Sequence, residues 1–329
     1  MKVYYVISIF LFSNFCNSQN PNIYLDKFLE SKLTEIEKTW NERGYWGKGF
    51  ENKDNRYNEA ITFYLSIETE EISYYNSRIK KAILFSIENL QNKEGAFIQE
   101  GESSHIRTSL FLHGLAKVAN KYPEIFNQEK IRISVNKAVK WLETPHKFSS
   151  NHNMASMLAL KSLYNVTCNN SYLKLHHFYR NIILRDYNES GYWPEAPKDW
   201  NNTLNTPYLF VQHFLLEEYL LNNTDEHITK LKNNLSNFIY SKINLKTCSV
   251  DVRGSLGNFK KNNVENLRFS VASFFWSSEI FKKLSNHQRN SILEKCVNNF
   301  KLETEKAEIL NNTDVFYRFG IIKPLIIKH

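Results

Sequence analysis

Residues 188–196 read NESGYWPEA, and residues 41–46 read NERGYW. A looser copy, NKEGAFIQE, occupies residues 92–100. Each copy carries Asn-x-x-Gly followed within two residues by an aromatic side chain, in a chain that has only ten glycines. A glycine directly after a helix ends that helix by adopting positive φ. The three copies therefore mark equivalent loops after equivalent helices.

The segments between these loops have the apolar periodicity of helices nearly throughout. The first places its apolar residues on one helical stripe, formed by Leu25, Phe28, Leu29, Leu33, Ile36 and Trp40. Similar stripes predict helices at 23–42, 55–69, 74–91, 105–121, 128–143, 151–166, 171–187, 206–222, 225–242, 264–282, 286–300 and 312–320. No convincing run of alternating strand residues occurs. The sequence therefore predicts an all-α fold of about twelve helices.

The connections between the predicted helices differ in length and composition. The long ones, rich in Gly, Asn and aromatic residues, occupy 43–54, 92–104, 188–205 and 243–263, with 144–150 as a shorter member of the series. Alternate connections of an up-and-down helical array lie at the same end, so these loops share one rim. A repeat of roughly 50 residues fits stacked helical hairpins. We expect the hairpins to close into an (α/α)6 toroid, a single domain over 19–329, with an open solenoid as the alternative.

The N-terminus reads as a secretory signal peptide over 1–18. Lys2 precedes an apolar run from Val3 to Phe12, and small residues favour cleavage after Ser18. A lipoprotein anchored through Cys16 is the alternative, although the bulky Phe15 before the cysteine disfavours it. We therefore expect a secreted or periplasmic protein, and no later segment reaches the roughly 20 apolar residues of a membrane span.

The chain is basic, with a formal net charge of +8 and a pI of about 9.0. Lysine and arginine are dispersed along the sequence rather than clustered, which disfavours binding to nucleic acid. The basic charge favours an anionic poly- or oligosaccharide as the substrate. We expect the protein to be a monomer. After signal cleavage the cysteines are Cys168, Cys248 and Cys296. Their wide spacing matches neither a disulfide framework nor a metal site, so we expect no metal and no cofactor.

The helices after the long loops begin with polar first turns. These contain Arg56-Tyr57-Asn58-Glu59, His105-Ile106-Arg107-Thr108, Asn151-His152-Asn153, Asn205-Thr206-Pro207-Tyr208 and Asn266-Leu267-Arg268. Several helix N-termini directed at one cleft favour a carboxylate or sulfate ligand. Ordinary capping accounts for Asn205 and Thr206. It does not account for His105, Arg107 and His152, which are poor caps, and we interpret these as candidate site residues.

The aromatic residues of the three loop copies have two interpretations. They either seal the top of the barrel or contact a ligand. For Trp46 and Phe97 sealing is at least as favoured as ligand contact, whereas Tyr192 and Trp193, followed by Pro194 and Glu195, favour a functional role.

The stretch SSNHNMASMLALKSLY at 149–164, together with GYWPEA at 191–196, resembles the helical-toroid part of bacterial heparinase-type and alginate-type polysaccharide lyases. It also resembles uncharacterised toroid proteins of bacterial polysaccharide-utilisation clusters, to whose Gly-Ser-Arg type loop the sequence DVRGS at 251–255 is similar. The likeness spans roughly residues 90–280 and rests on short motifs.

The resemblance implies β-elimination on a uronic acid, by a lyase or an oligosaccharide dehydratase. This reaction needs donors that neutralise the substrate carboxylate, a base for the C5 proton and an acid for the leaving oxygen. The donors assigned are Asn151 with Arg253 or Arg107, the base is His152 or His105, and the acid is Tyr192 or Tyr208. Further substrate contacts are predicted for Trp193, Glu195, Trp46, Glu100 and Arg268.

Two alternatives remain open. A toroid glycoside hydrolase would use paired carboxylic acids, and the rim loops supply Glu100, Glu195, Asp199 and Asp251. A noncatalytic glycan-binding toroid would keep the aromatic and arginine side chains, but it would not need the polar helix starts.

Overall fold

The structure is a computed structural model. It describes residues 34, 37–47, 49–56, 58, 59, 62, 63, 73–146, 149–195, 204–244, 249–253, 255, 266–268, 285 and 288. The predicted signal peptide at 1–18 and the predicted last helix at 312–320 lie outside these residues, so both stay predictions.

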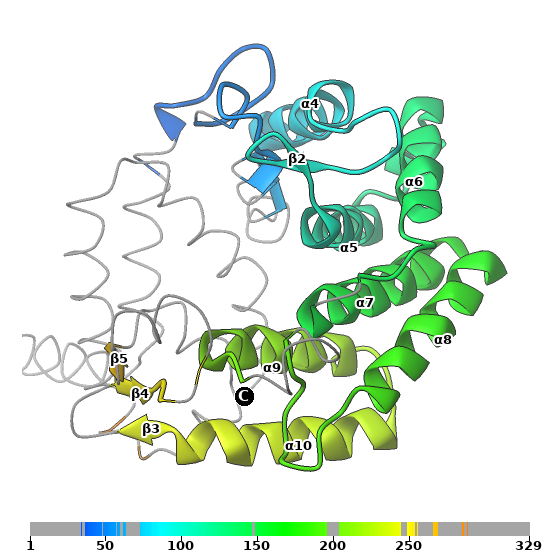
Figure 1. Ribbon diagram of the computed structural model, residues 1–329. Helices are drawn as coiled ribbons and strands as arrows, with labels where there is room; N and C mark the ends of the chain where they lie inside the picture. The colour runs from blue at the N-terminus through cyan, green and yellow to red at the C-terminus, as the bar shows by residue number, and fades with distance from the viewer. Residues whose placement is uncertain are drawn as a thin grey trace, which may run out of the picture.

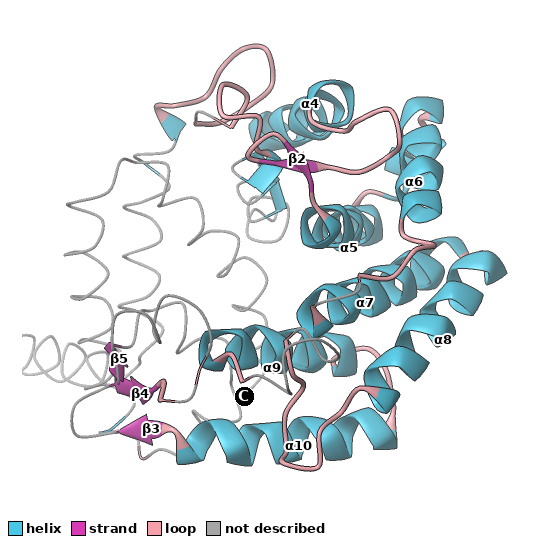
Figure 2. Ribbon diagram, in the orientation of Figure 1, coloured by secondary structure: helices cyan, strands magenta, loops and turns pink. Residues whose placement is uncertain are grey.

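The described part of the chain is mostly helical (Figure 1, Figure 2). Its seven α-helices are α4 (Ser73–Asn89), α5 (His105–Lys121), α6 (Glu129–Trp141), α7 (Ser150–Thr167), α8 (Asn170–Arg185), α9 (Thr206–Leu220) and α10 (Glu226–Ser241). A 3-10 helix, η1, spans Pro123–Asn127. The seven helices predicted between residues 74 and 242 are thus confirmed, with ends displaced by at most two residues. The total of about twelve stays a prediction.

The helices form two layers along an arc (Figure 1). Helices α5, α7 and α9 lie inside the arc, and α4, α6, α8 and α10 lie outside it. The composition explains this order, because the outer helices keep exposed polar faces whereas α7 buries its small and apolar residues on nearly every side. Small side chains such as Ala155 and Ala159, both fully buried, permit the close approach of neighbouring helices.

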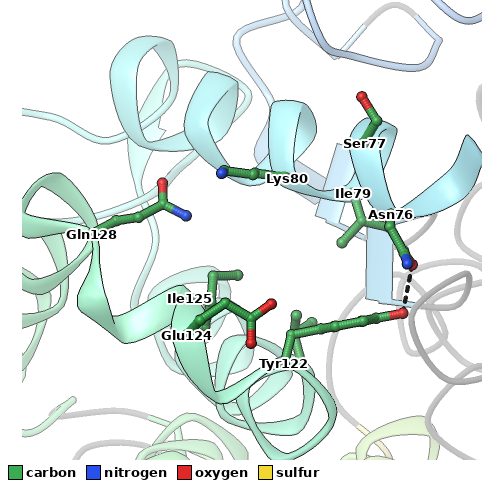
Figure 3. A pocket seen from close by; sticks show the side chains of 9 residues that line it. Asn76, Ser77, Ile79, Lys80, Tyr122, Glu124, Ile125 and Gln128 are labelled. Carbon is green, nitrogen blue, oxygen red and sulfur yellow. Dashed lines mark hydrogen bonds between the residues drawn. The ribbon is translucent and has the colours of Figure 1, made fainter. Parts of the chain in front are cut away.

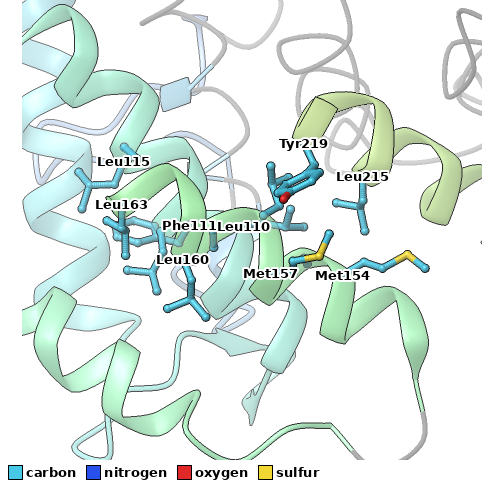
Figure 4. Packing of buried hydrophobic residues seen from close by; sticks show 14 of the residues in the cluster. Leu110, Phe111, Leu115, Met154, Met157, Leu160, Leu163, Leu215 and Tyr219 are labelled. Carbon is cyan, nitrogen blue, oxygen red and sulfur yellow. The ribbon is translucent and has the colours of Figure 1, made fainter. Parts of the chain in front are cut away.

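The core runs between the three inner helices. Figure 4 shows side chains of α5 packing against those of α7 and α9, among them Leu110, Phe111, Leu115, Met154, Met157, Leu160, Leu163, Leu215 and Tyr219. Each buried Leu, Met or Phe side chain contributes about 1.5 to 3 kcal/mol relative to an exposed one. At Gly114 a Cβ atom would lie 2.3 Å from the ring of Phe63, so this glycine permits close contact with the preceding inner segment.

Short strands occur in the long loops, which corrects the prediction that strands are absent. Strands β1 (Ile98–Gln99) and β2 (Glu102–Ser103) pair antiparallel. Strands β3 (Ile243–Asn244), β4 (Ser249–Asp251) and β5 (Asn266–Arg268) form an antiparallel sheet in the order β3-β4-β5. The prediction of a helix from residue 264 is therefore wrong at 266–268. Strands of two or three residues are too short to show a periodic pattern in the sequence.

The three loop copies adopt the same turn, which confirms their equivalence. In each, the Asn N–H donates to the carbonyl four residues later, in the pairs Asn41–Tyr45 (2.8 Å), Asn92–Ala96 (2.8 Å) and Asn188–Tyr192 (2.9 Å). The glycine N–H donates back to the Asn carbonyl in all three. The glycine φ angles are +108° at Gly44, +106° at Gly95 and +99° at Gly191.

Each copy then forms a hydrogen bond with a polar side chain of the helical segment that follows it, which is the segment around Asn58 for the first copy, α5 for the second and α9 for the third. The Trp46 N–H donates to Asn58 Oδ1 at 3.3 Å, and the Phe97 N–H donates to Thr108 Oγ1 at 2.9 Å. In the third copy the Trp193 carbonyl accepts from Gln212 Nε2 at 3.1 Å. Each copy of the repeated sequence is therefore fixed to the start or first turns of the helical segment that follows it.

Contacts between the long loops support the predicted common rim. The Gly101 N–H donates to the Lys53 carbonyl at 3.0 Å. Isolated backbone bridges pair Ser149 with Glu195 and Leu204 with Ser255. Loops that are far apart in the sequence thus meet at one end of the inner helices.

At the opposite half of the inner helices a buried ionic network joins α5, α7 and α9. Glu218 forms an ion pair with Lys117 and accepts from His113 Nε2 at 3.2 Å, while His113 Nδ1 lies 2.8 Å from Ser162 Oγ. Burial raises the pKa of Glu218, but the Lys117 charge and the His113 hydrogen bond outweigh it and lower the pKa to about 2. The network therefore fixes the relative positions of three helices.

Within the described residues, no helix is both long enough and apolar enough to cross a membrane.

We predict that Gly95→Ala destabilises the protein more than Gly191→Ala. Both residues have positive φ, which costs an alanine about 1 kcal/mol. At Gly95 a Cβ atom would also lie 2.3 Å from the Lys137 carbonyl oxygen, whereas at Gly191 its nearest neighbour is 3.8 Å away. Equilibrium urea unfolding measures the difference, expected to be about 2 kcal/mol. Equal losses would show that α6 yields to the added methyl group.

We predict that Lys117→Met lowers the free energy of unfolding by about 3 kcal/mol, because it leaves the Glu218 carboxylate buried without its cation. The control is Lys174→Met at an exposed position of α8, which is expected to change stability by less than about 0.5 kcal/mol. Similar stabilities for the two variants would contradict the role assigned to the network.

Candidate functional site

Three histidines meet at the rim end of the inner helices. His105 is the first residue of α5, His152 lies in the first turn of α7, and His146 lies in the loop before α7. The His105 and His152 rings are nearly parallel with centroids 6.0 Å apart. The His146 ring centroid is 4.4 Å from that of His152 and 5.5 Å from that of His105. The structure thus brings together the two predicted base candidates and adds a third imidazole.

His105 is held by hydrogen bonds to neighbouring elements. Its Nε2 lies 3.3 Å from the hydroxyl oxygen of Tyr179, which itself donates to the Leu142 carbonyl at 2.6 Å. Because the Tyr179 proton is directed at Leu142, the Nε2–H of His105 donates to Tyr179. Its Nδ1 faces Ser156 Oγ at 3.4 Å. These contacts bury His105 and orient it, whereas His152 keeps partial exposure.

Burial keeps these imidazoles neutral. Desolvation, followed by the effect of His146, lowers the pKa of His105 to about 3. Desolvation also lowers the pKa of His152 to about 2, helped by His146, His105 and Arg107. The pKa of His146 is lowered by burial as well. At neutral pH each ring is therefore unprotonated at one nitrogen.

Arg107 and Glu59 form a buried pair beside the histidines. Arg107 Nη1 lies 3.7 Å from Glu59 Oε1, and Asn55 Nδ2 donates to Glu59 Oε2 at 3.1 Å. Burial raises the pKa of Glu59 to about 8, and the Arg107 charge only partly opposes this shift. Arg107 follows His105 by two residues in the first turn of α5, so the pair lies at the same helix start as the histidines.

Glu195 forms the other side of the cluster. This buried carboxyl accepts from Gln212 Nε2 of α9 at 2.9 Å and interacts with the Ser149 hydroxyl and the Asn151 N–H of α7. Burial raises its pKa to about 7, against the opposing effect of these donors. Tyr208 of α9 remains 43% exposed, and its pKa is raised by burial and by Glu195. A carboxyl group able to hold a proton near neutrality thus lies close to an accessible phenol.

The predicted aromatic contacts need correction. Trp46 and Trp193 are fully buried, so neither ring is open to a substrate. The Trp193 Nε1–H donates to the Ile183 carbonyl at 2.7 Å, and Trp46 packs against Trp40. Tyr192 is 9% exposed and packs against Phe238 of the outer helix α10, not against the histidines. The sealing interpretation therefore holds for both tryptophans.

The remaining predicted contacts lie near the rim. Glu100 is exposed and accepts from Arg56 at 3.2 Å. Arg253 makes two hydrogen bonds to its neighbour Asp251, at 3.0 Å and 2.8 Å, and its loop meets the start of α9 where Ser255 Oγ accepts the Thr206 N–H. Arg268 lies on β5 opposite Ser249. Asp199, an alternative acid, lies outside the described residues.

Sequence reasoning missed three members of the cluster. Glu59 stands in a polar first turn that the sequence marks, but nothing local shows that its side chain is buried. His146 lies in a long-loop segment and was not singled out. Gln212 occupies the second turn of α9, where an isolated glutamine carries no motif.

Within the described residues, no group of three or more His, Cys, Asp or Glu side chains could hold a metal ion. Cavities occur at the other end of the helices. One of about 370 Å³ lies between α4, the end of α5 and η1, where Tyr122 donates to Asn76 Oδ1 (Figure 3). A more polar one of about 640 Å³ lies by the turn between α9 and α10. Neither is lined by a predicted site residue.

A comparison with solved structures finds a likeness to a crystal structure of D-mannose isomerase. The TM-score is 0.60 with 11% sequence identity, over 84% of this chain and 86% of the isomerase chain. The isomerase has an α/α toroid-type fold, so the likeness supports the toroid prediction. No protein-family model matches the sequence, and no curated protein matches it. This likeness concerns the fold and does not show a polysaccharide lyase in particular.

We predict that stability falls as the pH rises through 8, because the Glu59 pKa is raised in the folded state. The stabilising contribution of protonated Glu59 is complete below its ordinary pKa near 4.5 and is lost as the pH rises through about 8. The slope approaches about 1.4 kcal/mol per pH unit in this window. Glu59→Gln should flatten it, as measured by urea unfolding at pH 5, 7 and 9.

The matched control for this prediction is Glu143→Gln, at an exposed position just after α6. It should keep the wild-type pH dependence. A Glu59→Gln protein with the wild-type slope would show that another group causes the loss of stability.

Proposed function

We propose that this protein is a carbohydrate-active enzyme that removes a proton from a sugar carbon next to a carbonyl or carboxyl group. The observation that carries the proposal is the position of His152 in the first turn of α7, next to Asn151, with ring centroids 4.4 Å from His146 and 6.0 Å from His105. A neutral imidazole accepts the proton, and hydrogen-bond donors stabilise the oxyanion that forms on the adjacent carbonyl or carboxyl group. The fold likeness to D-mannose isomerase supports a sugar as the substrate.

Aldose–ketose isomerisation is the first candidate reaction. The unprotonated ring nitrogen of His152 takes the proton from the carbon beside the carbonyl group, and the C–H electron pair forms an enediolate. Returning a proton to the former carbonyl carbon, with transfer of the hydroxyl proton, yields the isomer without a change in mass. The exposed phenol of Tyr208 is the group at the rim that is suited to supplying an oxygen with a proton.

β-Elimination on a uronic acid is the second candidate, and Arg107 with Asn151 favours it. Here the same base takes the C5 proton, the electron pair forms the C4–C5 double bond, and the oxygen at C4 leaves with a proton. The dianionic intermediate needs a neutralised carboxylate, for which a guanidinium and an amide are suitable donors. Tyr208, exposed and near Glu195, is the acid available at the rim.

One experiment separates the reactions. Neutral and uronic-acid sugars are incubated with the protein in D2O and analysed by NMR and mass spectrometry. Isomerisation incorporates solvent deuterium into a product that otherwise keeps its mass. Elimination gives an ultraviolet-absorbing unsaturated uronate, whereas glycoside hydrolysis adds water. Hydrolysis, or no product from any sugar, would overturn the proposal.

We predict that His152→Ala lowers kcat by at least about 100-fold, because general-base catalysis contributes roughly 100- to 10,000-fold. His227→Ala, at an exposed position near the start of α10, is the control and should keep wild-type kcat. Circular dichroism checks that both proteins are folded. A His152→Ala enzyme with near wild-type kcat would remove His152 from the mechanism.

A further inference from the structure

The start of α7 is held by the end of a distant loop. Ser149 is the N-cap residue of α7, but its side chain makes no capping hydrogen bond. The Glu195 carboxyl group lies close enough to the Ser149 hydroxyl and the Asn151 N–H for both to lower its pKa. A backbone bridge also joins Ser149 to Glu195, and the Ser150 hydroxyl donates to the Pro194 carbonyl at 2.8 Å. The end of the third loop copy therefore holds the start of α7.

Glu195 is itself fixed from the opposite side. Gln212 Nε2 of α9 donates both to Glu195 Oε1 at 2.9 Å and to the Trp193 carbonyl at 3.1 Å. The buried Trp193 ring anchors the same segment to α8 through Ile183. A carboxylate at a helix N-terminus is stabilised by the unpaired N–H groups and the helix dipole. Loop, α9 and α7 thus converge on one carboxyl group.

We propose that Glu195 is a positioning residue whose carboxylate fixes the first turn of α7 and thereby orients Asn151 and His152 for proton abstraction. The catalytic part of this inference rests on the proposed function. Glu195 acts here through the α7 backbone, since its carboxylate is buried and directed at Ser149, Asn151 and Gln212. The Pro194-Glu195 dipeptide that follows GYW therefore supports the start of α7.

The Glu195 carboxyl group changes its charge near neutral pH. Burial raises the pKa of Glu195 to about 7, so the carboxylate gains its charge as the pH rises through this value. The titratable group facing it from α9 is Tyr208, and from α7 the adjacent one is His152. The pKa of Tyr208 is raised and that of His152 is about 2, so neither titrates near pH 7. Glu59, with a pKa of about 8, belongs to the Arg107 pair and should titrate separately.

The test compares Glu195→Gln and Glu195→Asp with the control Glu129→Gln. Glu129 is an acidic residue in the first turn of the outer helix α6, and it is exposed. Three quantities are measured: hydrogen exchange of the backbone amides at 151–153, the ring nitrogen NMR shifts of His152 against pH, and kcat and KM against pH.

In Glu195→Gln, amide exchange at 151–153 should be about tenfold faster, in line with the loss of a carboxylate at a helix N-terminus. The change in the His152 shifts near pH 7 should disappear, and kcat should fall about tenfold with KM nearly unchanged. The rise of kcat through pH 7 should also be absent. Glu195→Asp keeps the charge and should retain the pH-dependent rise, and Glu129→Gln should match the wild type in all three measurements.

Exchange and histidine shifts are measured without substrate, so they decide the positioning role even if the wild type converts none of the sugars. Failure of the wild type to convert any sugar would overturn the proposed function and leave the positioning role untouched. Wild-type exchange and wild-type histidine titration in Glu195→Gln would overturn the positioning role. If Glu195→Gln does not fold, Glu195→Asp decides: loss of the His152 titration near pH 7 despite the retained charge would contradict the inference.

Discussion

The structure depends on the close packing of α5, α7 and α9, three helices that are buried on nearly every side. Helices in this position cannot use solvent to satisfy polar groups, so every polar side chain on them needs a partner from another element. The apolar side chains of each helix pack in the core around Phe111, Met157 and Leu215. The polar parts are gathered at two places, the rim and the network around Glu218.

The rim shows how the same burial that stabilises the fold changes the chemistry of the residues it encloses. Removal of water lowers the pKa of His105 and His152 and raises the pKa of Glu59 and Glu195. Opposite shifts in neighbouring groups produce bases that are neutral and acids that keep their protons near neutrality. The buried tryptophans contribute indirectly, because they anchor the loops that carry these groups and take no part in ligand contact themselves.

The likeness to D-mannose isomerase concerns the arrangement of helices and does not by itself assign a reaction. At 11% identity the side chains at the rim must be interpreted on their own geometry. Isomerisation and β-elimination begin with the same removal of a proton next to an electron-withdrawing group. The proposal assigns this shared step to His152 as the base and Arg107 as a donor, which is why the two reactions stand together in it.

The sequence by itself determined the helices between residues 73 and 241, the equivalence of the three Asn-x-x-Gly loops and the position of His105 and His152 at helix starts. These features depend on local periodicity and on a turn that glycine alone adopts easily, and both are written in neighbouring residues. Only the tertiary structure decided that Trp46 and Trp193 face the core, that Glu59 is buried against Arg107, and that Glu195 pairs with Ser149 just before a helix that begins 45 residues earlier in the chain. Burial and pKa shifts arise from elements that are distant in sequence, so no local pattern contains them.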